Sequence, residues 1–248
     1  YWIPPIIAEE LETFDKTKNP ALQTAEAHFY LAYKDNKIVG KIAAIINWEE
    51  VNLLGKRKVR FGWFDAIDDI EVTKALLDKV EELGRKHNMD HMEGPMGFSN
   101  LDKVGILSEG FDQMGNMITW YSLPYYITHF EQLGFIKEKE YIESDFSFNG
   151  INPEPFQKAS ELIKKRYELR SLNFTKTKDI MPYVDKMFDL FNETYAKLQS
   201  FVPINDIQKE YFKKKYIGFI NPEFIKFIVD KNDNMIAFAI VMPGFAQA

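Results

Sequence analysis

The sequence predicts an α/β fold, a mixed and mostly antiparallel sheet flanked by helices, duplicated, with both copies incomplete in this chain. Antiparallel strand patterns are followed by a strand–helix–strand–helix–strand order, which is typical of a mixed sheet with helices packed on it. Short segments recur about 200 residues apart, which indicates a duplication. Hydrophobic residues make up 46% of the chain and charged residues 27%, which favours a folded globular protein over a disordered one.

The recurring segments keep the same order in both halves of the chain. Each match is weak alone, but three in one order at nearly one offset predict a duplicated domain. We expect residues 1–150 to hold a first copy without its first strand and helix. Residues 151–248 would hold a linker helix and the opening half of the second, so that the chain is the middle of a longer protein. The matched segments are Trp2–Pro5 with Phe201–Ile204, Asn19-Pro20 with Asn221-Pro222, and Asp35–Ala44 with Asp233–Met242.

Three strands open the first copy. Residues 29–33 and 38–47 form two strand patterns joined by the turn at 34–37. A third strand is expected over 59–64, after the basic turn at 55–58, which we interpret as a solvated hairpin tip.

A helix is expected next, from about 69 to 87, because apolar residues recur at three- and four-residue spacing. Its ends carry the charges that suit the helix dipole, acidic at the start and basic at the exit. A short strand over 90–93 and a loop over 94–115, rich in Gly, Pro, Ser and Asn, follow. The apolar face of the helix comprises Val72, Leu76, Leu77, Val80 and Leu83.

The first copy ends with a helix over about 124–133, which stops at Gly134, and an alternating strand over 141–148. Residues 149–155 form the linker. The second copy begins with a strand over 166–172 and an amphipathic helix whose apolar face runs from Ile180 to Tyr195.

Composition excludes several kinds of chemistry. The chain has no cysteine, which rules out thiolate catalysis, disulfides and cysteine-ligated metals. A formal net charge of −6 argues against binding to nucleic acid or to an anionic membrane surface. No apolar run approaches the roughly 18 residues of a membrane-spanning helix. We expect a cytoplasmic protein with no nucleic-acid or membrane partner. The oligomeric state, including a homodimer, stays open.

The end of the second helix carries a motif, Phe130-Glu131-Gln132-Leu133-Gly134-Phe135. It resembles the aromatic-Glu-x-x-Gly-Phe signature of the GNAT family, the acyl-CoA N-acyltransferase fold. Residues 61–135 also resemble a bacterial group of uncharacterised GNAT-like proteins, and duplicated versions of this fold are familiar. The resemblance implies transfer of an acyl group, acetyl or longer, from acyl-CoA to an amine. It implies acetyl-CoA or another acyl-CoA as the acyl donor and a small-molecule amine as the acceptor.

The turn before the first helix departs from the family pattern. GNAT enzymes hold the coenzyme A diphosphate on a glycine-rich strand-to-helix turn, through backbone N–H groups. The matching turn, residues 64–71, has no glycine and carries Asp65, Asp68, Asp69 and Glu71. We therefore expect the first copy to be degenerate and any acyl-CoA to bind the second, at residues that stay unknown. Asp65, Asp68 and Asp69 remain candidates for a substrate cleft.

Two residues are candidates for catalysis. The resemblance implies a tyrosine acid just before the helix glutamate, where this chain has Phe130. Tyr126, one turn earlier, is the substitute, with core packing against Phe130 as the alternative. Glu93, at a strand end beside the expected cleft, is the candidate base, with an ordinary strand-end carboxylate as the alternative. Ser99 and Asn100 lie in the long loop and are candidates for substrate contact.

A pair of histidines and two alternative functions remain to be considered. His87 and His91 are four residues apart but span a helix end and a strand start, so we expect a solvated terminus and no metal. The rival to an acyltransferase is a non-catalytic tandem module that binds a ligand or a protein, with the acidic turn recruiting cations or basic partners. An aminoacyl-tRNA-dependent transferase is disfavoured by the net charge of −6.

Overall fold

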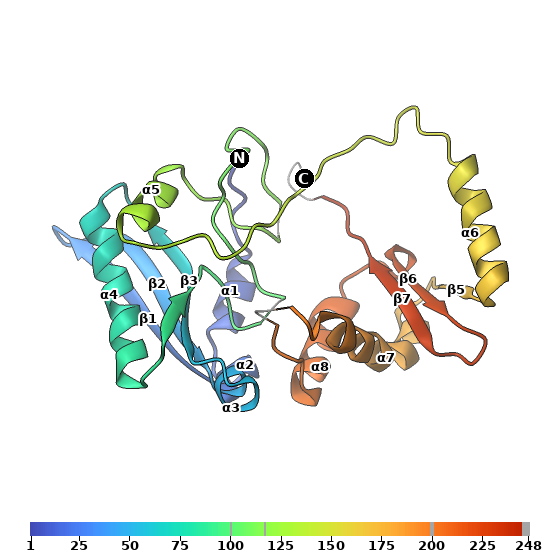
Figure 1. Ribbon diagram of the computed structural model, residues 1–248, viewed down its shortest axis with the longest axis horizontal. Coiled ribbons are helices and arrows are strands. Elements are labelled where there is room, and N and C mark those ends of the chain that lie inside the picture. Colours follow the sequence, from blue (N-terminus) through green and yellow to red (C-terminus); the bar gives the residue numbers. More distant parts are fainter. Residues whose placement is uncertain (100, 117, 199–200, 245–248) are drawn as a thin grey trace. The chain divides into compact units, whose positions relative to one another are not determined.

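The computed structural model describes residues 1–99, 101–116, 118–198 and 201–244. It divides into two compact units. Unit 1 is built mainly from Tyr1–Tyr141, and unit 2 from Ile142–Gln199 and Pro203–Pro243. Each unit has an antiparallel-dominated sheet with helices against it, so the mixed α/β class is confirmed (Figure 1).

Unit 1 has a four-stranded sheet in the order β1-β2-β3-β4. The first two pairings are antiparallel and the last is parallel. A parallel neighbour needs a crossover connection, and the helix α4 supplies it between β3 and β4. The strands are β1 (Ala25–Lys34), β2 (Lys37–Asn47), β3 (Lys58–Ala66) and β4 (His91–Glu93).

The core of unit 1 lies between this sheet and α4 (Ile70–Lys86). All five residues of the predicted apolar face of α4 are buried, and they pack against β2 and β3. The opposite face of the sheet holds a second apolar cluster with Ala43, Ile45 and Phe98. Because both faces of β2 are covered, residues 42–47 are buried without interruption.

The remaining helices of unit 1 are short. The helix α5 ends one residue before Leu133, and Gly134 follows with φ +86°, the left-handed conformation that glycine adopts most readily. The helix α3 was not expected from the sequence, and it separates β2 from the basic turn. These helices are α1 (Ile7–Thr13), α2 (Ala21–Thr24), α3 (Trp48–Leu54) and α5 (Tyr125–Gln132).

Unit 2 has a three-stranded antiparallel sheet in the order β5-β6-β7. Its core packs the predicted apolar face of α7 (Thr177–Tyr195) against β6. The other elements are α6 (Glu154–Tyr167), β5 (Arg170–Asn173), α8 (Asp206–Phe212), the π-helical turn η1 (Lys213–Ile217), the 3₁₀ turn η2 (Pro222–Phe224), β6 (Ile225–Val229) and β7 (Met235–Ile240).

Three expectations are corrected. Residues 141–148 form no strand within the described chain, because alternation alone makes no strand without a neighbour to pair with. The expected strand over 166–172 begins only at Arg170, because α6 continues to Tyr167 and ends at Glu168 in the left-handed region. Lys58, expected in a solvated tip, is 3% exposed and begins β3.

The two units share a local order of elements. In each, an Asn-Pro dipeptide precedes one helical turn and then a hairpin. The Asn19 side chain accepts from the Ala21 N–H at 3.0 Å, before α2 and β1. The Asn221 side chain accepts from the Glu223 N–H at 3.0 Å, before η2 and β6. Both hairpins turn through an Asp-Asn pair whose Asp has a positive φ.

Candidate functional site

Two charged side chains are buried where β3 and β4 pair. The parallel register places Lys58 opposite His91 and Arg60 opposite Glu93. Because side chains alternate along a strand, Lys58 and Arg60 lie on one face of β3, while Val59 enters the core with α4. Lys58 and Arg60 are 3% and 1% exposed.

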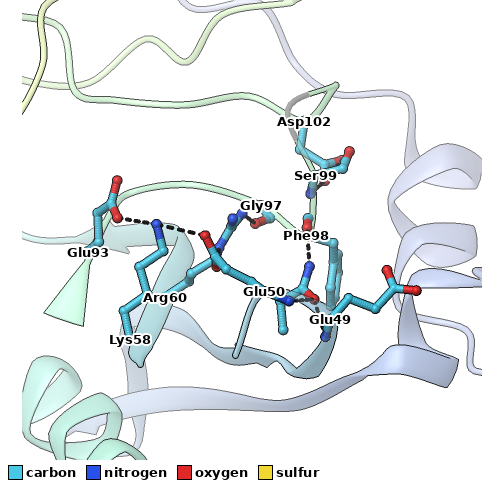
Figure 2. Close-up of polar contacts among 10 residues, drawn as sticks. Glu49, Glu50, Lys58, Arg60, Glu93, Gly97, Phe98, Ser99 and Asp102 are labelled. Atoms are coloured by element: carbon cyan, nitrogen blue, oxygen red, sulfur yellow. Dashed lines mark hydrogen bonds and ion pairs between the residues drawn. The ribbon is translucent and has the colours of Figure 1, made fainter. Parts of the chain in front are cut away.

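Glu50 of α3 forms ion pairs with both Lys58 and Arg60 (Figure 2). Its Oε1 lies 2.9 Å from Lys58 Nζ, and its Oε2 accepts from Arg60 Nε at 2.9 Å. The helix is started by Asn47, whose side chain accepts from the N–H groups of Glu49 and Glu50. This cap brings Glu50 onto the first turn of α3, directly after β2.

The buried cluster of Glu50, Lys58 and Arg60, together with Asn47, also holds the beginning of the long loop through hydrogen bonds. Arg60 Nη1 donates to the carbonyl of Gly97 at 3.0 Å, and Asn47 Nδ2 donates to that of Phe98 at 3.2 Å. A Cβ at Gly97 would lie 2.3 Å from Cβ of Asp102, so the loop closes tightly only with glycine there. The buried charges therefore fix the chain that leaves β4.

Glu93 completes the cluster through an ion pair with Lys58. Buried charges are tolerated when they are paired, and this group has two cations and two carboxylates. The Glu93 side chain is 15% exposed and is the most exposed of the four. The structure gives Glu93 an ion-pair partner, and its catalytic role stays a prediction.

Tyr126 of α5 is buried against the end of β3. Its hydroxyl donates to the Asp65 carboxylate and accepts from the Ala66 N–H at 3.1 Å. Its ring also packs against Phe64. Burial, and then the hydrogen bond to Asp65, raise the pKa of Tyr126, so the hydroxyl stays protonated. These contacts anchor α5 to β3, and the acid role of Tyr126 stays a prediction.

The acidic turn is occupied by contacts within the chain. Asp65 accepts from Tyr126, and Asp68 Oδ1 lies 3.2 Å from Nε2 of His129. Asp69 caps α4 by accepting from the Glu71 N–H at 3.1 Å, and it pairs with Lys34 at 2.9 Å. The hydrogen bond from Lys34 lowers the pKa of Asp69, so this carboxylate stays charged at the helix start. The turn therefore does not fit a diphosphate.

The loop candidates lie in a closed turn. The Ser99 N–H donates to Asp102 Oδ2 at 2.8 Å, and Ser99 Oγ accepts from the Leu101 N–H at 3.1 Å. Asn100 lies outside the described residues. The turn follows directly on Gly97 and Phe98, whose carbonyls accept from Arg60 and Asn47.

Four polar residues of this region were missed by sequence reasoning. Arg60 had a weak signal, because Lys58 and Arg60 alternate with apolar residues along a strand, whereas Glu50 lies in a short helix that the sequence pattern did not indicate. His129 of α5 is buried, and its Nδ1 lies 2.9 Å from Oγ1 of Thr73 on α4. Nothing in the sequence pairs His129 with Thr73, because the contact joins two helices 56 residues apart.

Two kinds of site are absent from the part of the chain described here. No group of three or more His, Cys, Asp or Glu side chains in that part is arranged to hold a metal ion. None of its helices has the length and apolarity that a membrane crossing requires.

Comparisons with known proteins identify two relatives. The chain is 29% identical over 177 residues to Protein YghO of Escherichia coli (strain K12), which covers 69% of this chain and 44% of the relative. It is 27% identical over 158 residues to the bacterial ceramide synthase of Caulobacter vibrioides (strain NA1000 / CB15N), which covers 63% of this chain and 41% of the relative. The chain thus spans less than half the length of these two relatives. No family model and no solved structure matches it.

Proposed function

We propose that this chain is part of an acyltransferase that moves an acyl group from an acyl-CoA to an amine. The observation that carries the proposal is the similarity to a protein named bacterial ceramide synthase. A ceramide is the amide of a fatty acid with a long-chain amino alcohol, so its synthesis forms an amide bond on an amine. We extend that reaction class to this chain, with the acyl length and the amine left to experiment.

The strand order of unit 1 supports a GNAT-like fold within this proposal. Its elements include β1, β2, β3, α4, β4 and α5 in that order, with α4 as the crossover to a parallel strand, which is the expected order without its closing strand over 141–148. The shared Asn-Pro turn and hairpin in both units support a duplication. We propose that unit 1 is degenerate in its diphosphate turn alone, because Asp69 occupies the start of α4.

The proposed reaction is direct attack on the thioester. The amine nitrogen forms a bond to the thioester carbonyl carbon, the carbon–sulfur bond breaks, and the thiolate leaves. The amine loses one proton and the thiolate gains one. We propose Glu93 as the group that accepts the amine proton through water, because it is the most exposed carboxylate of the buried group formed by Glu50, Lys58, Arg60 and Glu93. Tyr126 is the proposed donor to the thiolate because its hydroxyl carries a proton, although the burial and the bond to Asp65 that raise its pKa also weaken it as an acid.

The test is an acyl-transfer assay on the protein from its complete gene. Acetyl-CoA or palmitoyl-CoA is mixed with a short amine or with sphinganine. Released thiol is followed with a thiol reagent, and the amide is identified by mass spectrometry. The 248 residues contain no cysteine, so this part of the protein contributes no thiol background. We expect thiol release that requires the amine and yields an amide in equal amount.

A matched pair of variants tests the site. Glu93→Gln should lower the turnover rate about 100-fold or more, which is the usual contribution of a general base. Glu82→Gln makes the same chemical change on the exposed face of α4 and should leave turnover unchanged. Absence of thiol release with every donor and amine would overturn the acyltransferase proposal. Full turnover by Glu93→Gln would overturn the role of Glu93 alone.

Two observations favour the alternative, a non-catalytic tandem module that binds a ligand or a protein. Asp65, Asp68 and Asp69 have partners within the chain, so the turn suits neither a diphosphate nor the recruitment of cations, and Phe130, which has no proton to donate, packs in the core. A calorimetric titration of coenzyme A into the complete protein separates the two functions. Binding at one site per chain supports the enzyme, and no heat at millimolar ligand supports the module.

A further inference from the structure

The helix α6 (Glu154–Tyr167) is exposed along its whole length. None of its residues is buried, and its large apolar side chains face solvent, with Phe156 at 70% and Leu162 at 68% exposed. Figure 1 shows α6 joined to β5 at its C-terminal end, with no other helix or strand of unit 2 packed along it. An exposed apolar stripe on a regular helix marks an interaction surface.

The apolar residues of α6 share one face. At 3.6 residues per turn they fall within an arc of about 140°. The arc has the width of a helix face that is normally covered. Its members are Pro155, Phe156, Ala159, Leu162, Ile163 and Tyr167.

The charges of α6 are ordered around that face. Lys158, Lys164 and Lys165 lie on the sides of the helix between the two faces, while Glu154 and Glu161 lie opposite the apolar arc. Arg166 lies within the arc, where a long side chain can extend its charge outward. The helix has four basic and two acidic side chains, whereas the whole chain has a net charge of −6.

We propose that α6 binds flat on the surface of an anionic lipid membrane. Its apolar arc would enter the boundary between headgroups and acyl chains, and the lysines on its sides would contact lipid phosphates. The acidic side chains would face water. A groove on another protein would cover the arc but gives no reason for cations on both sides of it, so charge complementarity favours the lipid surface.

The proposal concerns the surface of a membrane and not a crossing. Fourteen residues of helix span about 21 Å, which is shorter than the roughly 30 Å of a hydrocarbon core. The net charge of −6 argued against a membrane partner, but it is a sum over the whole chain. It does not describe α6, where basic side chains outnumber acidic ones. The proposal does not depend on the acyltransferase function, because binding is measured without turnover.

The test is flotation of the 248-residue chain with vesicles of phosphatidylcholine, with or without phosphatidylglycerol. We expect flotation with the anionic vesicles, weakened by salt and by the absence of phosphatidylglycerol. Ile163→Glu, at the centre of the arc, should weaken binding about tenfold or more, because a charge cannot enter the acyl boundary. Gln157→Glu adds the same charge to the polar face of α6 and should keep most of the binding.

Two further variants separate the contribution of the basic side chains of α6 from that of exposed apolar side chains elsewhere. The triple variant Lys164→Gln, Lys165→Gln, Arg166→Gln should lose roughly fivefold per charge on anionic vesicles, and far less on neutral ones. Leu31→Glu alters an exposed apolar side chain on β1 and should keep binding intact. Circular dichroism checks that each variant is folded.

Three results would overturn the proposal. One is the absence of flotation with anionic vesicles. Another is equal flotation of the native chain and Ile163→Glu. The third is self-association in sedimentation that Ile163→Glu abolishes while no vesicle binding is seen, since α6 would then join two copies of this chain.

Discussion

In unit 1, residues 42–47 of β2 are covered on both faces of the sheet, whereas in unit 2 β6 is covered on one. Residues 42–47 of β2 are all buried, but in β6 the buried residues Ile225, Phe227 and Val229 alternate with more exposed ones. Covering the second face of the unit 1 sheet places Lys58 and Arg60 in the interior. Two similar hairpins therefore differ in their polar chemistry because of what packs on them.

The ion pairs of the two units also differ in how far their carboxylates are exposed. In unit 1, Glu50, Lys58 and Arg60 are each 3% exposed or less. In unit 2, Lys209 pairs with Asp189 and Lys213 with Asp185, and both carboxylates are more than half exposed. Lys209 and Lys213 are 14% and 10% exposed, but each also pairs with a second carboxylate, Asp206 or Glu210, that remains when the first is removed. Removal of Glu50 instead leaves two buried cations with less negative charge beside them. Stability should therefore depend on a single carboxylate only in unit 1.

The largest expected effect is that of Glu50→Gln. It leaves Lys58 and Arg60 buried with too little negative charge, and it should lower the free energy of unfolding of unit 1 by about 3–5 kcal/mol. All four tryptophans, at positions 2, 48, 63 and 120, lie in unit 1, so tryptophan fluorescence during urea unfolding follows that unit.

The matched control is Asp189→Asn in unit 2. It removes an exposed partner of Lys209 and should cost less than about 1 kcal/mol, measured by circular dichroism because unit 2 has no tryptophan. Equal and small costs in both variants would mean that burial does not distinguish the two sets of ion pairs.

A smaller effect is expected at the contact between α5 and β3. Tyr126→Phe removes the hydroxyl that bonds Asp65 and the Ala66 N–H, and it should cost about 1–3 kcal/mol because buried polar groups lose their partner. If Tyr126 is also the proton donor, turnover per folded molecule falls as well. Unchanged turnover would leave it a purely structural anchor.

The same residue predicts a dependence on alkaline pH. Burial, and next the hydrogen bond to Asp65, raise the pKa of Tyr126 above its unfolded value near 10. A group with a raised folded pKa stabilises the fold fully below its unfolded pKa, and this stabilisation is lost as the pH rises above about 10. The free energy of unfolding of the native chain should fall between pH 9 and about 11, and less steeply in Tyr126→Phe. Identical slopes would contradict this account.

The spacing of apolar residues along the sequence was enough to predict the helices whose formation depends on neighbouring residues. The helix α4 could be placed within a residue or two, because Val72, Leu76 and Val80 repeat at helical spacing. Residues 141–148 were misjudged because a strand requires a partner that a single segment does not reveal. Lys58 was misjudged because the side chain that permits its burial, Glu50, belongs to a short helix with no clear periodicity. Tertiary pairing of charges leaves no trace in a local pattern.

The smallest changes in the free energy of unfolding are expected from substitutions in the two Asn-Pro turns, which can be compared directly. Asn221 is exposed and accepts one N–H bond, so Asn221→Ala should cost about 0.5–1 kcal/mol. Asn19 is 8% exposed and also donates to the Thr13 carbonyl at 2.8 Å, so Asn19→Ala should cost about 1–2 kcal/mol. Fluorescence follows Asn19→Ala, and circular dichroism follows Asn221→Ala and the control Asn232→Ala, whose contact with Asp230 is made by its backbone N–H. A cost at both turns would indicate that the two copies use one structural device, and a cost at Asn19 alone would indicate that Asn221-Pro222 resembles Asn19-Pro20 in sequence only.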